Sequence, residues 1–153
     1  MPIYRRSMFS EAQSDDRMPR LTADDYEALA NFRYLLRKFL RFSKDFLKAN
    51  GNLSPEQYEA LLTIRAFTSI GGLTVSQLSE RLQVKHHSAV NIVDRLVERK
   101  LITREPGETD RRRRHVALAA KGEKLIEELA AAHRKEIRGR SVEMSKVLKR
   151  LMR

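Results

Sequence analysis

Hydrophobic residues recur at helical spacing along most of the chain, and polar residues between them mark where helices begin. Three times a Ser or Thr is followed three positions later by an acidic or amide residue, the spacing of a capping box. Pro55 stands at the first helical position of the second box, where its missing N–H costs nothing. Three helix starts are therefore predicted before residue 80: Thr22 with Asp25, Ser54 with Gln57, and Thr74 with Gln77.

The first predicted helix covers about residues 23–49 and stops at "NGN", residues 50–52. An apolar stripe follows one side of it, and core packing or a dimer seam explains this stripe better than a ligand pocket does. The stripe consists of Leu29, Phe32, Leu36, Phe39 or Leu40, Ser43, and Phe46 or Leu47.

Two short helices are predicted next to each other after a second helix over about 55–69. "LTVSQLSERLQV" places Leu78 and Leu82 inward, and "KHHSAVNIVDRLVERK" forms the following helix with its own apolar side, Ala89, Val93, Leu96 and Val97. A short helix, a tight turn and a second helix with a polar, basic outer side are typical of a helix-turn-helix. For this segment alone, a solvated surface helix is the simpler explanation.

The outer side of that last helix carries hydrogen-bonding residues and very little acid. His87, Asn91 and Arg95 recur at i, i+4 and i+8, with Ser88, Lys85 and His86 beside them. Such a side suits contact with nucleic acid.

A β-hairpin is predicted directly after the helix-turn-helix. Ile102, Val116 and Leu118 are strand-forming residues in period-two alternation, and Pro106-Gly107 marks a turn between them. A hairpin in this place makes a winged helix, so the expected fold class is mainly α with a small β-hairpin wing.

From Gly122 a helix is predicted to about Arg138. Gly139 should interrupt it, and a last short helix should carry Val142, Val147, Leu148, Leu151 and Met152.

Composition narrows the function without choosing it. The 153 residues suit one domain, and the formal charge of +11 favours a polyanionic partner, either nucleic acid or acidic membrane. There is no cysteine, and no stretch approaches the roughly 20 apolar residues that span a bilayer, so we expect a cytoplasmic protein. Residues 1–20 are polar and without periodicity, which indicates a mobile N-terminal arm that precedes the first helix. For the basic C-terminal segment 133–153, a membrane-surface helix is a lesser alternative to packing in a dimer.

The stretch "LTVSQLSERLQVKHHSAVNIVDRLVERKLITREPGETDRRRRHVALAAKG" resembles the MarR family of bacterial transcriptional regulators. Within it, "VDRLVERKLI" is similar to the family's recognition-helix end and first wing strand, and "TDRRRRHVAL" to its Asp-x-Arg wing signature. The signature falls on Asp110 and Arg112. The helix order on either side agrees with the family over roughly 21–153.

The resemblance implies a homodimer with two winged-helix lobes on one palindromic DNA site. Residues 21–50 and 120–153 would form the dimerisation helices and 54–119 the DNA-binding lobe of a single domain over 21–153. It also implies that Arg112 reaches into the minor groove while Asp110 helps hold the wing in shape. Three positions depart from the family pattern: Lys100 where glycine is usual, Ala119 where a threonine usually caps the next helix, and Lys85 where a Ser or Asp often caps the recognition helix. At Lys100 the left-handed helix cap that the resemblance implies must therefore be formed by a residue with a Cβ.

Individual contacts are assigned by the rule that base edges give specificity and phosphates give affinity. The base-contact candidates are His87, Ser88, Asn91 and Arg95, because Asn pairs well with adenine and Arg with guanine. The candidates for backbone contacts are Lys85, His86, Arg111, Arg113 and Arg114. We expect double-stranded DNA and a second copy of the chain as partners, and repression as the default regulation.

Other functions remain as alternatives. His86 and His87 do not suggest a metal site, because adjacent helix positions point about 100° apart, and no catalytic constellation or cofactor motif is present. A sequence-nonspecific nucleic-acid-binding winged helix and a protein-interaction winged helix stay open. Family members often respond to small aromatic or phenolic acids. Residues that could line a pocket for one, although core packing explains each equally well, are Tyr26, Phe32, Phe39, Phe42, Tyr58 and Phe67.

Overall fold

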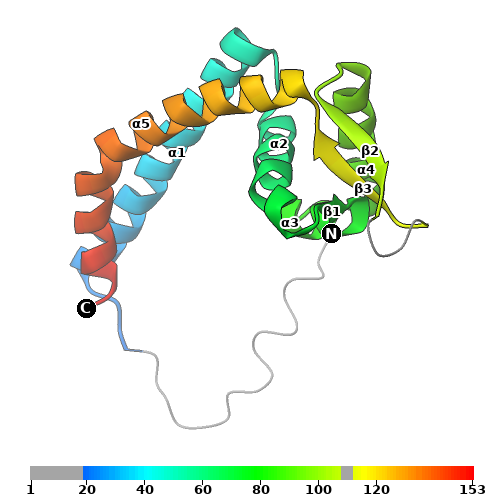
Figure 1. The fold of residues 1–153 in the computed structure, drawn as a ribbon. Coiled ribbons are helices and arrows are strands. Elements are labelled where there is room, and N and C mark those ends of the chain that lie inside the picture. Colours follow the sequence, from blue (N-terminus) through cyan, green and yellow to red (C-terminus); the bar gives the residue numbers. More distant parts are fainter. Residues whose placement is uncertain (1–18, 108–111) are drawn as a thin grey trace, which may run out of the picture.

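A computed structural model describes residues 19–107 and 112–153 and shows a two-helix arm that extends from a lobe of shorter elements (Figure 1). The arm consists of α1 (Ala23–Gly51) and α5 (Ala120–Leu151), which pack side by side. Leu35 and Leu47 of α1 and Leu129 of α5 are almost fully buried. The C-terminal part of α1 and the N-terminal part of α5 join the arm to the lobe.

The lobe is a helix-turn-helix combined with a three-stranded antiparallel sheet. Its elements are α2 (Pro55–Phe67), the 3-10 turn η1 (Thr68–Ile70), β1 (Leu73–Thr74), α3 (Val75–Leu82), α4 (His86–Glu98), β2 (Ile102–Pro106) and β3 (Arg114–Leu118). The strands are ordered β1-β3-β2 in the sheet, with Leu73 opposite Val116 and Ile102 opposite Leu118.

All three predicted capping boxes are confirmed. The side chains of Thr22, Ser54 and Thr74 each accept a hydrogen bond from the backbone N–H three residues on. The side-chain oxygen at that later position in turn accepts one from the backbone N–H of the cap residue. These local signals define the starts of α1, α2 and α3, because each satisfies amides that a helix end leaves without partners. The predicted fold class, mainly helical with a small wing, is also confirmed.

The prediction that Gly139 interrupts the last helix was wrong. α5 runs without a break through both Gly122 and Gly139. An interior glycine costs a helix only about 1 kcal/mol relative to alanine, and packing against α1 along the arm outweighs a penalty of that size.

Two further details differ from the sequence-based expectation. The two-residue strand β1 was not predicted, because its only strand signal is the pairing of Leu73 and Thr74 with β3. In the α1 stripe, Leu29 and Leu40 are 43% and 58% exposed, and Leu35 is buried in their place.

Among the described residues, no helix has the length and apolar character needed to cross a membrane.

Candidate nucleic-acid interface

The second helix of the helix-turn-helix, α4, is held against the lobe by one apolar side. Ala89, Val93 and Leu96 have no exposed surface, and Leu78 of α3 is likewise fully buried. Gln83 turns the chain between the two helices in the left-handed conformation, with φ of 55°. This packing determines which side of α4 faces solvent.

The opposite side of α4 presents the residues predicted to contact bases. His87, Asn91 and Arg95 are exposed on it, and Ser88 is half-buried. Lys85 occupies the N-cap without a side-chain hydrogen bond, as expected from its departure from the family pattern. The first turn of α4 contains no acidic residue, which suits the N-terminal end of this helix to phosphate.

The C-terminal end of α4 is closed by a Schellman motif that contains Lys100. The N–H of Lys100 donates to Val97 O at 2.9 Å, and the N–H of Leu101 donates to Leu96 O at 3.0 Å. Lys100 has φ of 58°, the left-handed conformation that glycine adopts most easily. The predicted left-handed cap at a residue with a Cβ is therefore confirmed.

The wing brings further arginines to the same part of the lobe. Arg112, Arg113 and Arg114 are exposed where β3 begins, and the N–H of Gly107 donates to Arg113 O at 2.8 Å across the hairpin. Asp110, the predicted support of the wing, and Arg111, a predicted backbone contact, lie outside the described residues. The wing is attached to α4 by an ion pair between Arg104 of β2 and Asp94.

A hollow of about 410 Å³ separates the wing arginines from the start of α3. It is lined by Arg113 and Arg114 on one side and by residues 74–77 on the other. Arginines facing a helix N-terminus form a positive surface on which a phosphate group is favoured. Residues 74–77 were not among the predicted contacts, because only the folded lobe places them opposite the wing.

The six aromatic candidates for an effector pocket lie in different parts of the molecule. Phe39, Phe42 and Tyr58 surround the buried ring of His133, with Tyr58 stacked on it at 4.4 Å between ring centroids. Tyr26 is 63% exposed, and Phe32 is half-buried. The described structure therefore does not gather these residues around one cavity, and the effector pocket stays a prediction.

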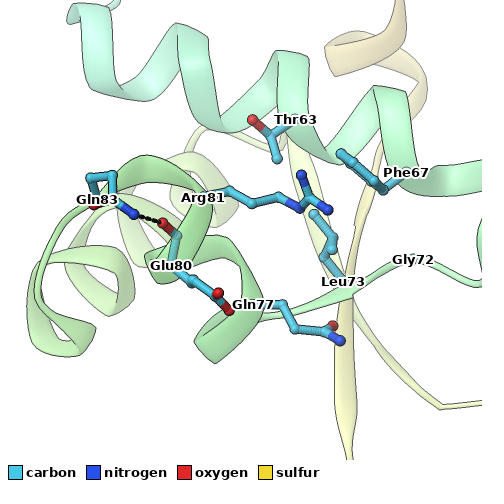
Figure 2. Close-up of a pocket in the computed structure, with 8 residues that line it drawn as sticks. All are labelled: Thr63, Phe67, Gly72, Leu73, Gln77, Glu80, Arg81 and Gln83. Atoms are coloured by element: carbon cyan, nitrogen blue, oxygen red, sulfur yellow. Dashed lines mark hydrogen bonds between the residues drawn. The ribbon is translucent and has the colours of Figure 1, made fainter.

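The sixth aromatic residue, Phe67, lies in a separate groove between α2 and α3 (Figure 2). The Arg81 guanidinium lies over the Phe67 ring, with its carbon 3.7 Å from the ring centroid. Thr63, Gln77 and Glu80 also line this hollow of about 650 Å³. Its lining is mainly polar, unlike the apolar surroundings of His133.

Comparison with known proteins supports the same fold. The family model described as MarR family matches residues 52–113. MepR, a transcription regulator of the Staphylococcus aureus multidrug efflux pump MepA, is 23% identical with a TM-score of 0.67, over 83% of this chain and 90% of MepR. YusO from Bacillus subtilis is 26% identical with a TM-score of 0.59, over 84% and 92% of the two chains.

A solved complex of S. aureus MepR with DNA is also similar. The identity is 22% and the TM-score 0.63, over 79% of this chain and 91% of that one. No curated protein matched in a sequence comparison. The resemblance to the MarR family is thus confirmed over residues 52–113, and the chain has the winged-helix fold of these similar solved structures.

Proposed function

We propose that this protein is a DNA-binding transcriptional repressor that acts as a homodimer on a palindromic operator. The observation that carries the proposal is the outer side of α4, where His87, Asn91 and Arg95 are exposed together. An α-helix fits the major groove, and these three residue types can hydrogen-bond to base edges there.

Sequence choice and affinity come from different residues in this proposal. His87, Ser88, Asn91 and Arg95 contact bases, while Lys85, His86, Arg111, Arg113 and Arg114 contact phosphates. Arg112 enters the minor groove, where a narrow A·T-rich segment concentrates negative potential, and Asp110 supports the wing. The formal charge of +11 strengthens all of these contacts at low salt.

Exposed apolar side chains on the arm support the dimer. Leu40 is 58% exposed on α1, and Ile137 and Val142 are 52% and 67% exposed on α5. An apolar hollow of about 340 Å³ lies beside Ile137, between Leu36, Phe39 and Met144. A second copy of the arm would cover these apolar side chains.

Selection of bound fragments from genomic DNA tests the proposed function. We expect an inverted repeat to be enriched, with affinity at least about a thousandfold above random DNA and falling steeply with salt. Enrichment of no particular sequence would instead identify a nonspecific nucleic-acid binder, and absence of DNA binding would leave the protein-interaction alternative. Repeating the selection with small aromatic acids tests the effector, and sedimentation analysis tests the dimer.

A further inference from the structure

The ends of three helices meet at Arg99, the residue that ends α4. Arg99 donates from Nη2 to Gly51 O at 2.7 Å and from Nη1 to Asn52 O at 2.9 Å, both at the C-terminal end of α1. Its own carbonyl accepts a hydrogen bond from Nζ of Lys121 in the first turn of α5, at 3.3 Å. The recognition helix is thereby bonded directly to both helices of the arm.

These bonds satisfy groups that helix ends otherwise leave without partners. The last carbonyls of α1 have no partner within the helix, and a cation is favoured at this negative end of the helix dipole. The planar guanidinium reaches two carbonyls at once, which a single ammonium group does not do with the same geometry. Arg99 is half-buried, so these bonds are partly shielded from water.

A second set of contacts connects the end of α4 to α5. The N–H of Ala119 donates to Leu101 O at 2.9 Å, next to the Schellman motif that ends α4. Gly122 lies so close to this carbonyl that no side chain fits between them. The end of α4 is therefore attached to α5 through the backbone at Leu101 and to α1 through the Arg99 side chain.

Resting on the proposed function, we propose that Arg99 is a positioning residue that sets the angle between the recognition helix and the arm. It thereby sets the separation of DNA half-sites that the dimer accepts. The arms of the two copies determine where the lobes stand, and a fixed angle at Arg99 passes that geometry on to α4. Arg99 itself reads no base in this proposal.

The first experiment measures the angle without DNA. Because the chain contains no cysteine, Arg41→Cys and Glu98→Cys place one spin label on α1 and one on α4. Labelled protein is mixed with an excess of unlabelled chain, and the distance distribution between the two labels is measured by pulsed electron paramagnetic resonance.

We expect Arg99→Ala to broaden the distance distribution and Arg99→Lys to broaden it less. Lys124→Ala, which removes another cation that lines a hollow together with Arg99, should leave the distribution unchanged. An Arg99→Ala distribution as narrow as the parent's would overturn the proposal.

The second experiment measures affinity for two half-sites at the preferred separation and at one two base pairs longer. The insertion rotates one half-site by about 70° and moves it by about 7 Å. We expect Arg99→Ala to reduce the preference for the shorter separation by about tenfold, the scale of one charged hydrogen bond, with single half-site preference unchanged. An unchanged separation preference in Arg99→Ala refutes the role of Arg99 alone. A parent protein with no preferred separation refutes the dimeric operator model and, with it, the effect on spacing.

Discussion

A Cβ atom on Gly122 would lie 2.0 Å from the carbonyl oxygen of Leu101. That distance is far inside van der Waals contact, and the atom it meets is backbone, which cannot rotate away as a side chain can. Glycine is therefore required where the first turn of α5 meets the chain that follows α4. In contrast, the helical Gly139 has nothing within 4 Å of its Cβ position.

Alanine substitutions at these two glycines should change stability in opposite directions. We expect Gly122→Ala to lower the free energy of unfolding by about 1–3 kcal/mol, because α5 must move away from Leu101. Gly139→Ala should raise it by about 0.5–1 kcal/mol, because alanine loses less backbone entropy in a helix. Urea unfolding of both variants measures the difference, and a stabilised Gly122→Ala protein would contradict the close approach.

Lys100→Gly should stabilise the protein. Lys100 has φ of 58°, a conformation that strains a residue with a Cβ by about 1–2 kcal/mol. Glycine removes that strain. Lys100→Ala is the control, because it removes the charge and keeps the Cβ. Thermal unfolding should therefore show a higher midpoint for Lys100→Gly than for Lys100→Ala. Equal midpoints would mean that charge rather than backbone conformation sets the effect.

The buried pair Ser43 and His133 should be energetically coupled. In the neutral ring, Nδ1 donates to Leu129 O at 2.7 Å because a carbonyl only accepts, which leaves Nε2 to accept from the Ser43 hydroxyl at 2.8 Å. Ser43→Ala leaves Nε2 buried without its partner, at a cost of about 1–3 kcal/mol. In the presence of His133→Phe the same substitution should cost less, as a double-mutant cycle of unfolding free energies would show. Additive effects would argue against the bond.

Arg112→Ala should weaken operator binding more than Arg5→Ala does. Both substitutions remove one positive charge, so a purely electrostatic contribution would be similar in each, whereas the proposed minor-groove contact involves only Arg112. Fluorescence anisotropy with operator and random DNA gives both affinities. Equal losses for the two variants would remove Arg112 from the proposed groove contact.

Asn91→Ala should relax base preference at one position of each half-site. An asparagine paired with adenine contributes about 1–3 kcal/mol of discrimination at its own base pair, and the other positions should keep their preference. Site selection with the variant and the parent protein measures this. An unchanged preference at every position would exclude Asn91 from base contact.

Much of the fold could be predicted because its signals are local. The capping boxes at Thr22, Ser54 and Thr74 depend on residues three apart, and each was found where the pattern placed it. The apolar spacing of Ala89, Val93 and Leu96 likewise determined which side of α4 is buried. The predicted base-contact residues could be chosen for the same reason, since they occupy the remaining side.

Contacts between distant parts of the chain were not predictable in this way. No local pattern indicates that Leu73 pairs with Val116, or that residues 74–77 face Arg113 and Arg114 across a hollow. Spacing also gave the wrong result at Gly139, because helix propensity was judged without the packing of α5 on α1.

The sequence by itself determined three helix starts, the helix-turn-helix and wing, and the basic character of the surface. These follow from short-range hydrogen bonding, side-chain periodicity and charge. Only the tertiary structure decided that Arg99 joins α4 to α1, that Gly122 meets Leu101, and that aromatic rings enclose His133. Each of these contacts joins residues at least 20 positions apart, so it depends on how packed helices approach one another and leaves no mark in a local pattern.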